Sequence, residues 1–248
     1  MIELRGVSKR LGSKQVLDGL DLDIPTGVTM VVLGRSGTGK SVLLKHIIGL
    51  MHPDEGTIEV DGEDIAHLDE AELDRVRQRF GMLFQGAALF DSLSVGENIA
   101  LPLREHTRLS DAEVRKRVAE RLEWVGLKGV EDMKPSSLSG GMKKRVGLAR
   151  AIAMDPAYIL YDEPTTGLDP INSDVINQLI RSLQARIGVT SVVVTHDLHS
   201  AWKVGDRLAL LHEGRVQFTG TPAEATASRD LLVQQFIQGM SEGPVRVV

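Results

Sequence analysis

The sequence predicts an α/β fold with a helical lobe inserted into it. Short apolar segments of strand length alternate with amphipathic segments of helical spacing at both ends of the chain. Between them, residues 86–156 keep helical spacing only. A chain of 248 residues can bury one large core. We therefore expect a single domain over residues 1–248, a helical subdomain inserted at 86–156 and a C-terminal tail at 240–248.

The first third predicts strands around one helix. Leu20, Leu22 and Ile24 alternate with aspartates, which is typical of a half-buried strand. The β-branched run at 29–33 predicts a buried strand, and Asp61-Gly62 predicts a hairpin turn. The strands expected here are 2–7, 20–24, 29–33 and 57–60, followed by a charged helix at 69–79 and the apolar segment 80–84.

The remaining elements follow from the same patterns. Ser110 and Glu113 form a capping box before a helix whose apolar residues recur at spacings of four and three: Val114, Val118, Leu122 and Val125. After the lobe we expect a strand at 157–161, a helix at 173–187, a strand at 189–195, a hairpin at 206–219 around Glu213-Gly214, and helical segments over 222–239. We also expect a helix at 229–239 whose apolar stripe is Leu232, Phe236 and Met240.

The composition excludes several classes of protein. The chain has 29 Lys and Arg against 34 Asp and Glu, so a broad basic surface for nucleic acid is not expected. It has no cysteine, which excludes disulfides, thiolate metal sites and a cysteine nucleophile. No signal-peptide core opens it, and no apolar run approaches the roughly 20 residues that span a bilayer. We expect a soluble, cytoplasmic protein that reaches a membrane only through a partner.

Residues 34–41 fit the phosphate-binding pattern G-x-x-x-x-G-K-[ST]. The glycines let backbone N–H groups turn toward an anion, and the start of the following helix adds positive potential. Lys40 is expected to reach the β- and γ-phosphates of a nucleoside triphosphate, and Ser41 to ligate Mg²⁺. We call this segment the phosphate loop, and we expect it to bind nucleotide through Gly34, Arg35, Ser36, Gly37, Thr38, Gly39, Lys40, Ser41 and Val42.

Two acids, Asp162 and Glu163, follow the apolar strand segment at 157–161. Two surface acids after a strand are common by themselves. Beside a complete phosphate loop, the sequence favours another role, in which Asp162 holds Mg²⁺ and Glu163 polarises an attacking water.

The segment Leu138-Ser139-Gly140-Gly141-Met142 resembles the signature motif of ATP-binding-cassette (ABC) ATPases. Ser139 can cap the next helix, and the two glycines let backbone N–H groups approach an anion. The motifs also follow the family's order, and the resemblance covers nearly the whole chain: phosphate loop, Gln85, signature, Asp162-Glu163, Gly167-Leu168-Asp169 and His196. It implies a P-loop core with a mixed sheet, an antiparallel β subdomain and an inserted helical lobe.

The resemblance implies roles for individual residues. Lys40, Glu163 and His196 would be catalytic, with Glu163 as the base and His196 on the γ-phosphate. Gln85 would join Ser41 and Asp162 around Mg²⁺. Two copies of the chain would enclose two ATP molecules, and the residues reaching or coupling the partner's nucleotide would be Ser139, Gly140, Gly141 and Asp169.

Two positions depart from the family pattern. Met142 stands where the family usually has Gln, and Leu11 stands where an aromatic side chain usually stacks on adenine. An aromatic stack contributes on the order of 1 kcal/mol, so nucleotide affinity or base selectivity is expected to fall. We expect Leu11 and Val16 to lie at the base.

Several stretches resemble one branch of the family, the ATPases of Mla/Mce-type phospholipid transporters. They are residues 83–90, 102–107, the Met-ending signature with Lys143-Lys144-Arg145, and 239–245. The resemblance implies a homodimer on the cytoplasmic face of a bacterial inner membrane. It also implies three further partners and no nucleic acid: a permease dimer, an Mce-type substrate-binding protein and a small STAS-domain protein.

Two segments predict contacts with partners. Residues 85–99, here called the apolar stretch, contain Ala87, Ala88, Leu89, Phe90, Leu93 and Val95, and we expect part of it to receive a permease helix rather than to fill the lobe's own core. The chain ends in three valines among its last four residues, and we expect this tail to dock on the other ATPase subunit.

Other functions are open on the sequence alone. The chain could serve another transporter, such as an amino-acid or metal importer, or act as a soluble ABC ATPase in cluster assembly or repair. Repair proteins need long coiled-coil insertions and translation factors usually carry two cassettes, and neither is found here. A regulatory module without turnover is opposed by the presence of both Glu163 and His196. Membrane partners that co-purify would separate a transporter from the soluble classes.

Overall fold

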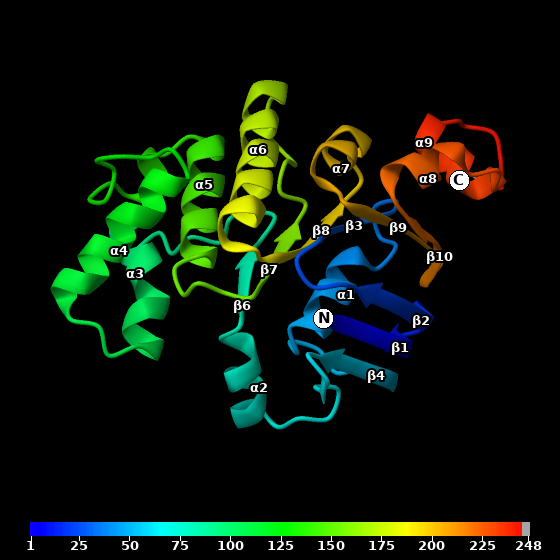
Figure 1. Ribbon diagram of the computed structural model, residues 1–248, viewed down its shortest axis with the longest axis horizontal. Coiled ribbons are helices and arrows are strands. Elements are labelled where there is room, and N and C mark those ends of the chain that lie inside the picture. The colour runs from blue at the N-terminus through cyan, green and yellow to red at the C-terminus, as the bar shows by residue number, and fades with distance from the viewer. Residues whose placement is uncertain (245–248) are drawn as a thin grey trace. The chain divides into compact units, whose positions relative to one another are not determined.

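A computed structural model of the chain describes residues 1–244 (Figure 1). The chain forms two compact units. The first unit joins residues 1–68 to the chain from Val192 onward, and the second unit contains residues 69–191. The terminal segment 245–248, to which the tail prediction applies, lies outside the described residues.

The first unit contains an antiparallel sheet of four strands in the order β2-β1-β4-β5. Ile2 pairs with Ile24 on one side and with Val60 on the other. The strands are β1 (Ile2–Leu11), β2 (Lys14–Ile24), β4 (Glu55–Val60) and β5 (Glu63–Asp64). The predicted antiparallel subdomain and its hairpin turn are confirmed, and β1 runs further than the sequence indicated.

The strand that precedes the phosphate loop lies in a second sheet of this unit. β3 (Thr29–Leu33) is buried at all five positions and pairs in parallel with β9 (Arg207–His212). β9 pairs antiparallel with β10 (Arg215–Gly220), which confirms the predicted hairpin, and β8 (Thr190–Thr195) follows β3 on its other side. The unit's helices are α1 (Lys40–Ile47), α7 (Leu198–Val204), α8 (Pro222–Ala227) and α9 (Leu231–Gln238).

One expectation for these helices needs correction. α9 is present, but its inner face is not the predicted stripe: Val233 is buried and lines a small apolar pocket with Phe236 and Ile237. Met240 follows the left-handed cap at Gly239 and is exposed. A spacing of four drifts around a helix of 3.6 residues per turn, which moves the stripe off the buried face.

The second unit contains two parallel strands and five helices in its described residues. β6 (Phe80–Leu83) pairs with β7 (Tyr158–Asp162). The helices are α2 (Glu70–Arg77), α3 (Val95–His106), α4 (Asp111–Trp124), α5 (Gly140–Ala151) and α6 (Pro170–Ile187), with a short 3₁₀ turn at Pro135–Ser137. Ser110 and Glu113 form the predicted capping box. The predicted lobe, 86–156, lies within this unit.

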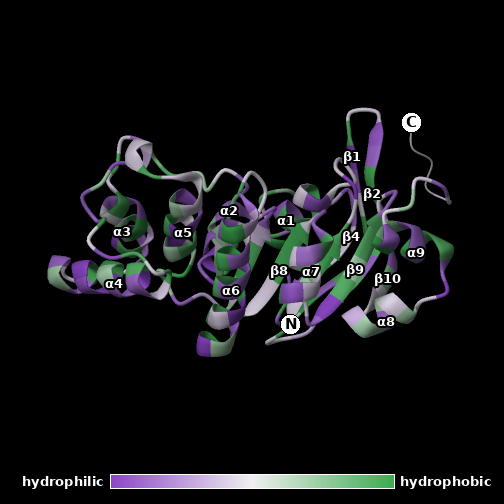
Figure 2. Cartoon of the chain, turned by 90° about the horizontal axis from the view of Figure 1, so that it is seen from above, coloured by the Kyte–Doolittle hydropathy of each residue, from purple (hydrophilic) through white to green (hydrophobic). Residues whose placement is uncertain are grey.

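Hydropathy follows these elements. In Figure 2, strand β8 carries green along much of its length, whereas helices α4 and α6 carry purple along part of their surface. The apolar residues predicted for α4 and its C-terminal cap are all buried: Val114, Val118, Leu122 and Val125. Across residues 1–244, no helix combines the length and apolar character that crossing a bilayer requires.

Within the second unit, α5 passes so close to β6 that Gly81 has no room for a side chain. A Cβ at Gly81 would overlap the carbonyl oxygen of Ala151, the last residue of α5. Backbone cannot yield as a side chain tip can, so the helix and the strand would have to separate. Gly86 has nothing within 4 Å of its Cβ position.

We predict that Gly81→Ala lowers the free energy of unfolding by about 1–3 kcal/mol, the usual cost of overpacking. Gly86→Ala is the control and should stay within about 0.5 kcal/mol of the unsubstituted chain. Chemical denaturation of both variants measures the difference. Equal midpoints for the two would show that α5 and β6 can move apart at no cost.

Candidate functional site

The phosphate loop connects β3 to α1 and depends on glycine at three positions. Gly37 and Gly39 have φ angles of 79° and 102°, which side chains rarely adopt. A Cβ at Gly39 would lie 3.0 Å from Val16 Cγ1, and one at Gly34 would lie 2.7 Å from the Leu211 carbonyl oxygen. The loop therefore presents bare backbone, which is what a wrapped polyphosphate requires.

Lys40 brings a positive charge into this loop. Its side chain is buried, and Nζ donates hydrogen bonds to the carbonyl oxygens of Gly34 (2.8 Å) and Arg35 (3.0 Å). α1 has no side-chain N-cap, since Gly39 occupies that position. The first N–H groups of α1 and the ammonium group therefore favour an anion at the same place. Ser41 follows directly and is exposed.

A cavity of about 570 Å³ opens beside the loop, and we call it the nucleotide cavity. Its volume is within the range of small-molecule sites. It is lined by Lys14, Gln15, Val16, Arg35, Ser36, Gly37, Thr38, His212, Glu213, Gly214 and Pro244. Val16 lines this cavity, and Leu11 at the end of β1 is 42% exposed, while contact of either residue with a base stays a prediction. These residues fit a nucleotide.

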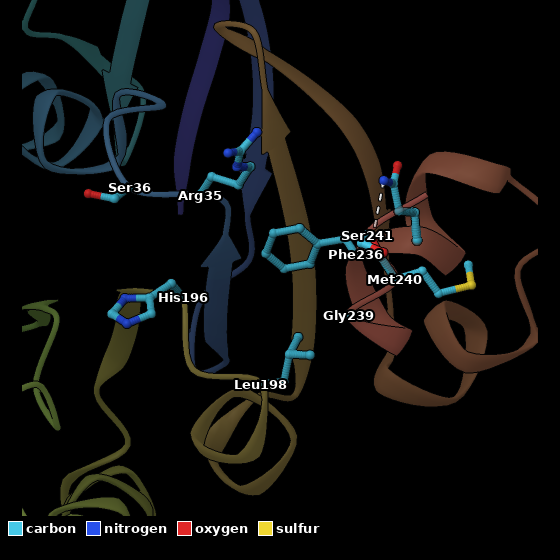
Figure 3. Close-up of a pocket in the computed structure, with 9 residues that line it drawn as sticks. Arg35, Ser36, His196, Leu198, Phe236, Gly239, Met240 and Ser241 are labelled. Atoms are coloured by element: carbon cyan, nitrogen blue, oxygen red, sulfur yellow. Dashed lines mark hydrogen bonds between the residues drawn. The ribbon is translucent and has the colours of Figure 1, made fainter. Parts of the chain in front are cut away.

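A second cavity of about 520 Å³ shares Arg35 and Ser36 with the first. In Figure 3, the imidazole of His196, which follows β8, lies on the same side of Phe236 as Arg35 and Ser36 do. The ring of Phe236, from α9, points toward these residues. His196 is exposed. The first unit thus places His196 and the phosphate loop around one cavity, although contact with a γ-phosphate stays a prediction.

In the second unit, Glu163 begins the turn after β7. The residue is 9% exposed and has a φ angle of 47°, in the left-handed region. Its carboxylate Oε2 accepts a hydrogen bond from Thr166 Oγ1 at 3.2 Å. Its carbonyl oxygen accepts one from Thr166 N, also at 3.2 Å. The turn therefore orients both the peptide group and the side chain of Glu163.

Lys144 is a member of this site that sequence reasoning missed. It is 5% exposed on α5, and its Nζ donates to the Glu163 carbonyl oxygen at 3.2 Å. Burial lowers the pKa of Lys144, while the charges of Asp162 and Glu163 oppose that shift. The sequence carried a signal, because Lys144 falls at helical spacing with three buried residues of α5: Gly141, Leu148 and Ala151.

The signature and Asp169 are connected through Asn172. Ser139 caps α5, accepting a hydrogen bond from Met142 N at 3.2 Å, and both Ser139 and Gly140 are exposed. Asp169 caps α6 and also accepts from Asn172 Nδ2 at 2.5 Å. A Cβ at Gly141 would lie 2.7 Å from Asn172 Oδ1, so a side chain at this position would require Asn172 to shift. Hydrogen bonds from Asn172 lower the pKa of the Asp169 carboxyl, and the bond from the Asn172 side chain contributes most.

Gln85 is exposed and precedes a turn whose carbonyl groups are hydrogen-bonded to a side chain of α5. Ala87 and Ala88 have φ angles of 61° and 48°. The guanidinium of Arg150 donates to the carbonyl oxygens of both residues, at 2.8 Å and 2.7 Å. The turn after Gln85 is therefore fixed by the C-terminal end of α5.

Residues 1–244 contain no group of three or more His, Cys, Asp or Glu side chains placed to hold a metal ion. The predicted magnesium residues instead offer one hydroxyl, one amide and one carboxylate: Ser41, Gln85 and Asp162. Such hard oxygen donors suit Mg²⁺, which usually takes one or two protein ligands together with phosphates and water. The donor set fits magnesium delivered with a nucleotide.

A family model described as ABC transporter matches residues 17–166. This span contains the phosphate loop, the signature and Glu163. The chain is an ABC transporter ATPase. Its fold is accordingly that of ABC cassettes, and it binds and hydrolyses ATP.

Curated relatives of this ABC ATPase divide by substrate. It is 44% identical over 246 residues to the intermembrane phospholipid transport system ATP-binding protein MlaF of Haemophilus influenzae, covering 99% of this chain and 93% of that protein. It is also 44% identical over 244 residues to the probable ribonucleotide transport ATP-binding protein mkl of Mycobacterium leprae, covering 98% of this chain and 70% of that protein.

Solved structures of ABC proteins have a similar fold. The ABC ATPase is similar to the ATP-binding cassette MJ0796, solved as a dimer in a post-hydrolysis state bound to ADP and Pi. The TM-score is 0.83 and the identity 37%, over 89% of this chain and 98% of that one. It is also similar to cbiO1 of Clostridium perfringens, with a TM-score of 0.84 and 29% identity over 97% and 94% of the two chains.

Proposed function

We propose that this ABC ATPase works as a homodimer that encloses two ATP molecules and drives a membrane permease in phospholipid transport between membranes. The ATPase part is supported by two features, each within its own unit: the charged, glycine-formed phosphate loop of the first unit and the oriented acid Glu163 of the second. The phospholipid part rests on the 44% identity to MlaF over 93% of that protein's length.

In this proposal the first unit binds the triphosphate. Backbone N–H groups of the phosphate loop and Lys40 Nζ neutralise the β- and γ-phosphates, and His196 contacts the terminal phosphate. Ser41, Gln85 and Asp162 would hold Mg²⁺, which would screen the phosphate charge when bound. Glu163 orients and polarises the attacking water, and the transition state gains from positioned charge rather than from covalent chemistry.

The homodimer follows from the signature. The N–H groups at the start of α5 lie beside two glycines, with Ser139 and Gly140 exposed, and can donate hydrogen bonds to the γ-phosphate of ATP bound by a second copy. The ATP-binding cassette MJ0796, at 37% identity, has been solved as a dimer, which supports dimer formation by this chain. ATP then bridges two chains, and hydrolysis removes the bridging phosphate, so the nucleotide shifts the population between closed and open dimers.

The apolar stretch supports a permease partner. Its residues divide between core and surface: Ala87 and Val95 are buried, whereas Phe90 is 52% exposed and Ala88 is exposed. Phe84, just before the stretch, is 36% exposed. Burying an exposed phenylalanine against a permease helix contributes roughly 1.5–3 kcal/mol. Part of the stretch therefore remains available to a partner.

Glu163→Gln should bind ATP like the unsubstituted chain and lose hydrolysis by at least 100-fold, because the amide cannot accept the proton of the attacking water. Lys40→Ala should instead weaken ATP binding by at least tenfold, since a charge-assisted hydrogen bond contributes about 1.5–3 kcal/mol. Lys45→Ala, an exposed lysine on the same helix, is the control. Phosphate release and fluorescent-nucleotide titration measure the two effects. Near-normal turnover by Glu163→Gln would remove the assigned role.

The transport assignment is tested by reconstitution. The chain is purified from detergent extract with its membrane partners and placed in proteoliposomes containing labelled phospholipid. We expect ATP-dependent transfer of the label to acceptor vesicles, and no transfer with Glu163→Gln. ATP-dependent uptake of a labelled ribonucleotide, with no lipid transfer, would favour the second candidate that the mkl relatives suggest. Absence of any membrane protein from the purified complex would contradict both.

A further inference from the structure

We propose that Lys144 is a positioning residue for ATP hydrolysis, which holds Glu163 in its working orientation through a hydrogen bond to the Glu163 backbone. The proposal rests on the role proposed above for Glu163. It concerns a residue that makes no predicted contact with nucleotide, metal or water, so its effect would pass entirely through Glu163.

The first argument is the backbone at Glu163. A φ angle of 47° is uncommon for a residue with a side chain, and such a conformation persists where its surroundings hold it. The backbone torsion angles at Glu163 set the direction in which its side chain leaves the chain, and therefore where the carboxylate points. A small rotation about φ would move the carboxylate by a distance that general-base chemistry does not tolerate.

The second argument is the convergence of donors on this peptide. The Glu163 carbonyl oxygen accepts from Thr166 N and from Lys144 Nζ, each at 3.2 Å. The Thr166 bond is local and belongs to the same turn, so it moves with that turn. The Lys144 bond comes from α5, 19 residues away in the sequence, and so ties the turn to a rigid element.

The third argument is the cost of placing a lysine here. Lys144 is 5% exposed, and taking an ammonium group out of water is unfavourable by several kcal/mol before its contacts are counted. An apolar side chain of similar length would fill the same space without that cost. What a methionine could not supply is the N–H donor at the Glu163 carbonyl. The geometry therefore points to orientation of Glu163, rather than stability, as the use of this side chain.

The test compares Lys144→Met with Lys143→Met, in which the neighbouring lysine, half-buried and outside this hydrogen bond, is changed in the same way. We expect Lys144→Met to lower kcat at least tenfold, with the KM for ATP within twofold and a melting temperature unchanged or higher. Lys143→Met should keep kcat within twofold. A Lys144→Met kcat within twofold of the Lys143→Met value would overturn the proposal.

Two further variants separate positioning from a general structural effect. Lys144→Gln keeps an uncharged N–H donor and should recover part of the lost kcat, whereas a purely structural defect would not be rescued. In a Glu163→Gln background, adding Lys144→Met should change the residual single-turnover rate less than twofold. A tenfold loss there would show that Lys144 acts elsewhere, and would overturn the proposal.

The proposal can fail separately from the function on which it rests. If Glu163→Gln hydrolyses ATP normally, the role of Glu163 is wrong and Lys144 has nothing to position. If Glu163→Gln is inactive while Lys144→Met is fully active, the role of Glu163 stands and the Lys144 proposal alone is contradicted.

Discussion

The structure depends on one constraint, that a polyphosphate must be surrounded by backbone N–H groups and a positive charge. Bare backbone requires glycine, and Gly37 and Gly39 meet this with left-handed φ angles. The positive charge is that of Lys40, whose buried ammonium group is held in the loop by hydrogen bonds that it donates to the carbonyl oxygens of Gly34 and Arg35. The parallel pair β3 and β9 then fixes where the loop begins, and α1 fixes where it ends.

A similar arrangement is found in the second unit, where basic side chains of α5 donate hydrogen bonds to the carbonyl oxygens of irregular turns. Lys144 bonds the Glu163 carbonyl, and Arg150 bonds those of Ala87 and Ala88, all at residues with positive φ. Strained turns of this kind persist where their surroundings define them. One helix therefore begins at the signature, orients the acid after β7 and fixes the turn after Gln85.

Much of this could be predicted from the sequence because it is local. The phosphate loop, the capping box at Ser110 and the cap at Asp169 each depend on residues within a few positions of one another. What could not be predicted depends on distant partners. The hydrogen bond from Lys144 to Glu163 has no signal in the neighbours of Glu163, since Lys144 lies on α5, and the contact of Gly141 with Asn172 joins two helices. The prediction for the buried face of α9 was wrong, because which of its residues are buried depends on the surface against which the helix packs.

The central claim is that the signature of one chain completes the ATP site of another. Sedimentation of the Glu163→Gln chain with ATP, compared with the same chain that also carries Ser139→Arg, tests it most directly. We expect an ATP-dependent dimer for the first and a monomer for the second, with equal ATP affinity for each chain, because the proposed contact of Ser139 is with the partner's nucleotide alone. Equal dimer formation by both chains, or a Glu163→Gln chain that stays monomeric with saturating ATP, would contradict it.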